Sequence, residues 1–176
     1  KSILSFKEQI IAAFLLLIPL VNFTIGSLWL MLGLKVSAII FPFSFIIAIA
    51  LCFILFQKKA TSKTLVLNLF YGFAMFLICV FICRWFYDIS FDGQWYHQDA
   101  IILMSEGWNP FHDAPLLIEQ TSGACAPYLN HYPKGSWIIS AYLYHFLNNI
   151  QMAKAYNLLF IISAFLYCIY YLKKWL

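Results

Sequence analysis

The sequence predicts an all-α membrane protein, a polytopic helical bundle with an outer loop that contains juxtamembrane helices. Of its 176 residues, 64% are hydrophobic and only 10% are charged, and the mean hydropathy is +0.83. Roughly 20 apolar residues cross a hydrocarbon core, and lipid permits only helices or closed barrels to span it. The apolar runs here are continuous and lack the period-2 alternation of barrel strands, so we expect helices.

Residues 1–64 are expected to form a transmembrane helical hairpin followed by a cytoplasmic loop. Two long apolar stretches, residues 10–34 and 36–56, meet at a turn formed by Gly33, Leu34 and Lys35. Cytoplasmic segments carry an excess of lysine and arginine, which places both ends of this hairpin in the cytoplasm. The lysines that orient it are Lys1, Lys7, Lys58, Lys59 and Lys63.

Residues 65–176 are expected to hold two further spans, 65–86 and 155–172, separated by an outer loop (87–134) and a short embedded helix (135–148). Residues 136–147 would be about 18 Å long as a helix, too short to cross a bilayer. Lys173 and Lys174 follow the last span. They reach the cytoplasmic side, as the positive-inside rule favours, only if the short helix does not cross. This gives four spans.

The outer loop concentrates the polar chemistry of the chain. Residues 88–134 hold every acid except Glu8, whereas Lys134 is their only lysine or arginine. The net charge of +4 is therefore an orientation signal and gives no indication of nucleic-acid binding. By this topology the loop is expected to face the periplasm or an organelle lumen, and we expect a multi-pass protein of the bacterial inner membrane with this loop in the periplasm. Its acids are Asp88, Asp92, Asp99, Glu106, Asp113 and Glu119.

One segment of this loop has the pattern of an amphipathic helix. Asp92 precedes it and Gly107 ends it, as expected of an N-cap and a C-cap. We expect the helix to lie flat on the membrane surface with its apolar face towards lipid, holding Asp92 at the mouth of a cavity. The apolar face comprises Tyr96, Ala100, Ile101, Leu103 and Met104.

The register Asp92, Tyr96, Ala100, Leu103, Gly107, Trp108 resembles the first outer loop of GT-C glycosyltransferases, especially bacterial enzymes similar to protein mannosyltransferases and aminoarabinose transferases. Residues 131–160, "HYPKGSWIISAYLYHFLNNIQMAKAYNLLF", resemble the family's approach to a short helix followed by a span. The resemblance covers about residues 85–172 and implies that the chain is the N-terminal portion of a longer protein. Three features depart from the family pattern: two additional spans before residue 65, and Gly93 and Pro133 at positions where the family has acids.

The resemblance implies transfer of a sugar from a polyprenyl-phosphate-linked donor to a glycan, lipid or protein acceptor on the outer face. Such a reaction needs a carboxylate that accepts or orients the acceptor hydroxyl's proton and a cation that stabilises the departing phosphate. Asp92 is the predicted catalytic residue, and Lys134 matches the family's phosphate-contacting lysine. Their alternatives are a helix N-cap for Asp92 and an interfacial, snorkelling lysine for Lys134. Predicted accessory residues are Tyr96, His97, Asp88 and His131.

No cofactor is indicated by a motif, although a divalent metal is left open because imidazoles and carboxylates suit zinc or manganese. The residues that could contribute are His97, His112, Asp113 and His131, but no pair has a diagnostic ligand spacing. Histidines that bond the loop backbone are the favoured alternative. Cys125 is the only cysteine in the loop, which excludes a disulfide framework there.

Two other classes of function stay open on the sequence alone. A lipid-linked-sugar transporter or flippase would usually carry ionisable residues inside its spans, but the predicted spans contain no acid. A non-catalytic membrane scaffold with a folded outer loop would need no particular aspartate at a helix tip. Membrane lipids are expected partners in each of these classes.

Overall fold

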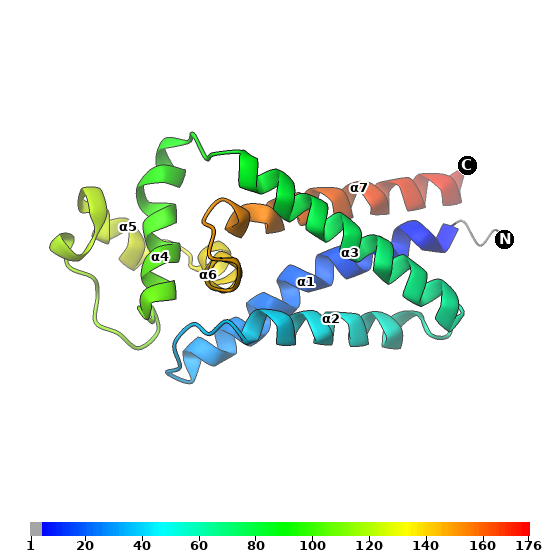
Figure 1. Ribbon diagram of the computed structural model, residues 1–176, viewed down its shortest axis with the longest axis horizontal. Helices are drawn as coiled ribbons and strands as arrows, with labels where there is room; N and C mark the ends of the chain where they lie inside the picture. Colours follow the sequence, from blue (N-terminus) through cyan, green and yellow to red (C-terminus); the bar gives the residue numbers. More distant parts are fainter. Residues whose placement is uncertain (1–4) are drawn as a thin grey trace.

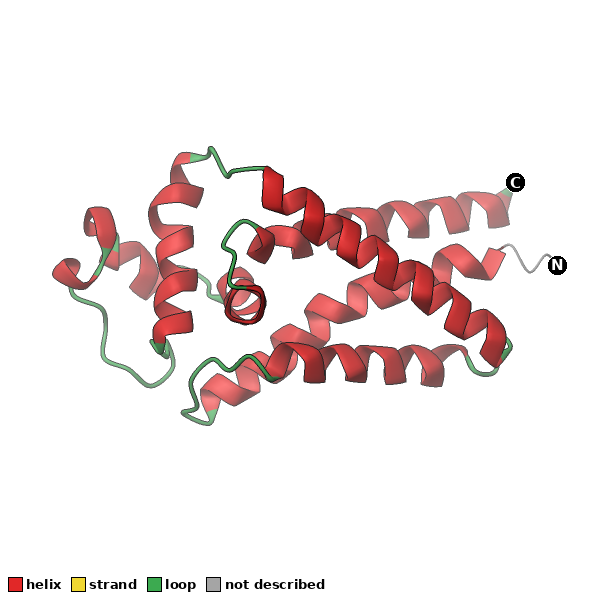
Figure 2. Ribbon diagram, in the orientation of Figure 1, coloured by secondary structure: helices red, strands yellow, loops and turns green. Residues whose placement is uncertain are grey.

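The computed structural model describes residues 5–176, and within that range the chain forms helices and no strand (Figures 1 and 2). The all-α class is therefore confirmed. Lys1, one of the predicted orientation signals, lies outside the described residues. The seven α-helices of the described range are α1 (Ser5–Met31), α2 (Ile40–Phe56), α3 (Ser62–Trp85), α4 (Gln98–Glu106), α5 (Ala126–His131), α6 (Gly135–Leu147) and α7 (Ala155–Trp175). Short helical turns add η1 (Gly93–His97), η2 (Ile118–Gln120), η3 (Ser122–Ala124) and η4 (Met152–Lys154).

Three helical segments are long and apolar enough to cross a membrane: Phe6–Met31, Ser62–Trp85 and Met152–Trp175. The predicted second span is shorter than expected, because α2 has 17 residues and is about 25 Å long at 1.5 Å per residue. Its first residues do not join the helix. Gly33 takes a φ of +81°, and the Trp29 indole donates to the Lys35 carbonyl at 2.9 Å, which holds residues 34–37 in a connecting loop.

The long helices run back and forth, so that the two ends of the molecule differ in charge. Figure 1 shows the N-terminus, the C-terminus and the α2–α3 turn at one end, here called the basic end. An ion pair between Lys173 and Glu8 joins α7 to α1 there. The opposite end, here called the loop end, holds α4, α5 and α6 together with all the acids except Glu8 (Figure 1). Lysines of the basic end are Lys7, Lys58, Lys59, Lys63, Lys173 and Lys174.

Helix α6 lies across the bundle rather than along it, and Figure 1 looks nearly down its axis. Residues 137–143 of this helix are all buried. The Tyr142 hydroxyl donates to the Gly26 carbonyl of α1 at 3.0 Å, and the Ser140 hydroxyl donates to the Ala153 carbonyl at 3.1 Å. The short helix is thus embedded in protein at the loop end, where it forms the floor beneath α4.

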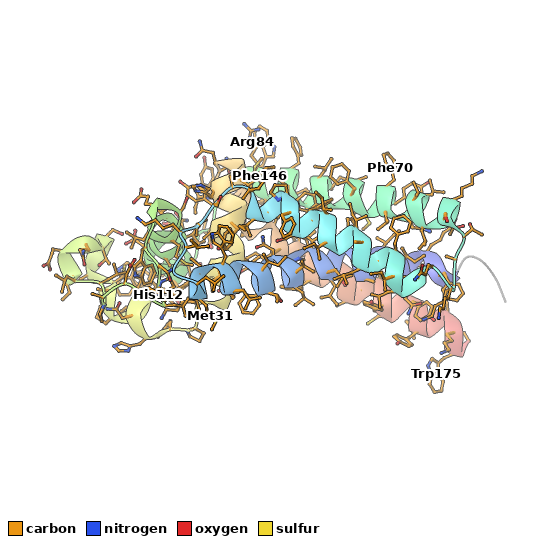
Figure 3. All side chains as sticks on the ribbon, turned by 90° about the horizontal axis from the view of Figure 1, so that it is seen from below. Met31, Phe70, Arg84, His112, Phe146 and Trp175 are labelled. Atoms are coloured by element: carbon orange, nitrogen blue, oxygen red, sulfur yellow. The ribbon has the colours of Figure 1, made fainter. Side chains whose placement is uncertain are left out.

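The outward faces of the long helices are strongly apolar. Phe70 projects away from α3 in Figure 3 and is 64% exposed, although buried aromatic rings such as Phe14, Phe41 and Phe76 fill the interior between α1, α2 and α3. A protein in water rarely exposes such a large apolar area. The exposed apolar belt therefore suits a lipid environment.

Candidate functional site

The chain leaves α3 through a tight turn built on Asp88. Its carboxylate Oδ1 accepts the backbone N–H of Ser90 at 3.0 Å and the hydroxyl of Ser90 at 2.6 Å. The Ser90 hydroxyl oxygen in turn accepts the Gly93 N–H at 3.1 Å, which caps the following helical segment. The hydrogen bond from the Ser90 side chain lowers the pKa of Asp88, and the nearby charge of Lys154 acts in the same direction. Asp88 is therefore an ionised, structural carboxylate.

Asp92 does not cap the helix, which corrects the alternative expected from the sequence. Its side chain makes no capping hydrogen bond, because Ser90 already fills that role and the helical conformation has begun at residue 91. The exposed carboxylate instead interacts with the hydroxyl of Tyr96, one turn along. Burial, together with this carboxylate, raises the pKa of Tyr96. Asp92 thus remains at the surface with no capping role.

A π-helical turn, η1, connects Asp92 to α4. The Gln98 N–H donates to the Gly93 carbonyl, five residues back, and such widened turns are frequent at functional sites. Gly93 is required here, since an added Cβ would lie 2.2 Å from Asp88 Oδ2. The position where the GT-C pattern has an acid is thus already occupied in space by the Asp88 carboxylate.

His97 is held in one tautomer by a neighbour from α6. The Trp137 indole N–H, which can only donate, bonds His97 Nδ1 at 2.6 Å. Neutral His97 therefore carries its proton on Nε2, which makes that nitrogen a donor. Burial lowers the pKa of His97, although the charges of Asp92 and Asp88 oppose this effect. The imidazole is accordingly neutral at pH 7.

These groups surround a pocket of about 280 Å³ at the loop end, between the turn after α3, η1, α6 and the start of α7. Asp88, Gly93 and His97 line it from one side, and Gln151 and Lys154 from the other. Gln151 Oε1 accepts the Asp88 N–H at 3.2 Å and the Lys154 ammonium at 2.7 Å. Asp92 is not among the lining residues, but its sequence neighbour Gly93 is. Gln151 and Lys154 were not predicted as site residues, because no local pattern in the sequence indicates that they lie beside Asp88.

Lys134 lies elsewhere and is largely occupied. Its ammonium donates to the carbonyls of Asn130 at 2.8 Å and Tyr132 at 2.7 Å, at the end of α5, and lies 5.7 Å from the centroid of the Trp137 ring. It lines a separate pocket with Asp113 and His131, and Asp92 is not part of that pocket's lining. Burial lowers the pKa of Lys134. The structure gives this lysine a backbone-capping role and does not bring it to Asp92.

The remaining predicted residues have packing or backbone roles. The Tyr96 ring stacks on Tyr128 at 5.4 Å between centroids and meets Tyr132 edge-on, so its ring is a packing element. His112 Nε2 bonds the Met31 carbonyl at 2.8 Å, and Figure 3 shows the two residues together at the loop end. His131 is exposed. No group of three or more His, Cys, Asp or Glu suited to a metal forms among residues 5–176.

The apolar face of the predicted amphipathic helix is covered by protein, not by lipid as expected. Ala100, Ile101 and Met104 are buried in one cluster with Trp137 and Ile138 of α6. On the other side of α4, Asp99 Oδ2 accepts the Ser122 N–H at 2.7 Å and the Cys125 thiol at 3.3 Å. Gly107 ends α4 with a φ of +117°, as predicted. A hydrophobic stripe predicts burial but does not identify the surface that covers it.

The five cysteines of the chain form no disulfide. Cys52, Cys79, Cys83, Cys125 and Cys168 are all free. Burial raises the pKa of the Cys125 thiol to about 11, which makes it a poor nucleophile.

Comparison of the chain with family models, curated proteins and solved structures finds no match.

Proposed function

We propose that this protein transfers a sugar from a polyprenyl-phosphate-linked donor to an acceptor on the outer face of a membrane, as its resemblance to GT-C glycosyltransferases implies. The acceptor is a glycan, lipid or protein. The observation that carries the proposal is the polar pocket at the loop end, flanked by an aspartate that is free of any capping role. Pocket and aspartate adjoin a bundle with three helices long enough to span a bilayer.

The distribution of charge between the two ends of the molecule supports this assignment. The basic end carries Lys7, Lys58, Lys63 and Lys174, and it would face the cytoplasm of a multi-pass protein in a bacterial inner membrane. The loop end would then face the periplasm. A lipid-phosphate headgroup in the outer leaflet would lie at the depth of the pocket.

The roles follow from the exposure and the hydrogen bonds of the groups. Asp92 is the proposed proton acceptor for the attacking hydroxyl, since its exposed carboxylate is available and acid–base assistance is worth typically 10² to 10⁴ in rate. His97 supplies an N–H from Nε2 that orients a sugar or phosphate oxygen. Asp88 holds the turn on which both residues are built.

Reconstitution of the whole protein into proteoliposomes tests the proposal. Radiolabelled sugar presented on polyprenyl phosphate should become covalently attached to an acceptor supplied on the outer side. Movement of the intact lipid-linked sugar between leaflets without transfer would identify a flippase instead. If neither sugar transfer nor movement of the lipid-linked sugar is observed, the result favours a non-catalytic scaffold.

A further inference from the structure

An apolar groove adjoins the polar pocket. It has a volume of about 360 Å³ and lies between the end of α3 and the start of α7. Two residues, Lys154 and Asn157, line both the groove and the polar pocket. The two spaces therefore meet at a lysine. The groove is lined by Ile82, Cys83, Phe86, Lys154, Asn157 and Leu158.

We propose that this groove binds the hydrocarbon chain of a lipid monophosphate and that Lys154, where groove and pocket meet, binds its phosphate. The inference rests on the proposed function and assigns phosphate binding to Lys154 in place of Lys134. It follows from the chemistry of the two spaces, because one ligand would place an apolar tail in the first and an anionic head beside the second.

Lys154 has more N–H groups left for a ligand than Lys134 has. An ammonium has three N–H groups, and the bond to Gln151 uses one of those of Lys154. Lys134 spends two on backbone carbonyls and lines a pocket formed by loop residues. Lysine binds phosphate as a point charge, and a bound phosphate would share the charge of Lys154 with the neighbouring Asp88 carboxylate.

The groove also opens where a membrane lipid can reach it. Ile82 of α3 is 41% exposed, and Phe86, which directly follows α3, is 65% exposed. A lipid can therefore enter sideways from the bilayer, and its head can pass to His97 and Gly93 inside the polar pocket.

Direct binding tests the assignment without any need for catalysis. The whole protein in phosphatidylcholine nanodiscs is titrated with a long-chain polyprenyl monophosphate, with the matching polyprenol, and with inorganic phosphate. The monophosphate should bind at least about tenfold more tightly than either fragment of it, the factor expected for one charge-assisted contact. If the polyprenol binds as tightly as the monophosphate, the proposed phosphate site is contradicted. If inorganic phosphate binds as tightly as the monophosphate, the proposed binding of the hydrocarbon chain in the groove is contradicted.

Matched substitutions locate the site. Lys154→Gln should weaken monophosphate binding about tenfold and Lys154→Arg should preserve it, whereas Lys134→Gln should stay within about twofold of wild type. Leu158→Trp fills the groove and should weaken binding, whereas Ile161→Trp, on the exposed face of the same helix, should not. Melting temperatures identify any variant that fails to fold. Unchanged binding by Lys154→Gln, or loss in Lys134→Gln alone, would overturn the assignment.

The two proposals can fail separately. If the protein binds a lipid phosphate through Lys154 but transfers no sugar, the proposed function is contradicted and the proposed binding site is supported. If Lys154→Gln changes neither sugar transfer nor donor binding, the proposed function is supported and the proposed phosphate site is contradicted.

Discussion

At the scale of single residues, the carboxylates of the loop end differ in role, since some hold the backbone and Asp92 does not cap its helix. Asp88 is bound by Ser90, and Asp99 is bound by Ser122 and Cys125. Asp92 has the local sequence of a cap, yet Ser90 takes that role. A carboxylate released from capping can be replaced by an amide without loss of the helix, which makes Asp92 a clean target for mutation.

His97 should make stability depend on pH. Its pKa lies below 6.5 because of burial, so the unfolded chain takes up a proton more readily than the folded protein. The neutral imidazole therefore contributes stability above about pH 6.5, and this contribution is lost as the pH falls from there through the lowered pKa.

Thermal unfolding of wild type and His97→Gln across this range measures the effect. The difference in melting temperature in favour of the wild type should shrink as the pH is lowered from about 7 to about 5. A difference that stays constant or grows would show that His97 is not held neutral by burial and by Trp137.

At the scale of elements, the packing of α6 against α1 determines where the residues of the pocket lie. Gly26 lets the Tyr142 ring lie against the α1 backbone, where the hydroxyl also bonds the Gly26 carbonyl. Helix α6 then carries Trp137, which fixes His97. Packing between α1 and α6 thus controls the geometry of the pocket.

Gly26→Ala should separate these two helices. An added Cβ would lie 2.3 Å from Tyr142 Cε2, closer than two carbons can approach. Overpacking of this kind destabilises a core by about 1 to 3 kcal/mol. Gly135→Ala is the matched control, because its Cβ would lie 3.6 Å from Phe23 and be in ordinary contact. The melting temperature should fall only for Gly26→Ala, and equal effects from both would contradict the α1–α6 contact.

Elements were predictable from the sequence where the signal was local. The long apolar helices and the end of α4 at Gly107 follow from runs of hydrophobic residues and a glycine with positive φ. The surroundings of His97 were not predictable, since its partner Trp137 lies on another helix. Nor could the sequence tell that Lys134 bonds backbone carbonyls rather than projecting from the surface.

At the scale of the whole molecule, the separation of charge predicts which end faces the outside of the membrane. The acids lie mainly at the loop end, and the lysines expected to face the cytoplasm lie at the basic end. Single cysteines at Glu119 and Lys174, in a variant lacking the native cysteines, probe the two ends. In right-side-out vesicles an impermeant maleimide should label position 119, and position 174 only after permeabilisation. Labelling of both without permeabilisation would contradict the topology.

Sugar transfer at the loop end is proposed to depend on Asp92. The most direct test compares transfer from polyprenyl phosphate by wild type, Asp92→Asn and Glu119→Gln in proteoliposomes. Asparagine keeps the shape of the side chain and removes its basicity, and Glu119→Gln removes one negative charge from the same loop. Asp92→Asn should fold with an unchanged melting temperature and lose about two orders of magnitude or more in transfer rate, whereas Glu119→Gln should retain its activity. Wild-type transfer by Asp92→Asn would contradict the account.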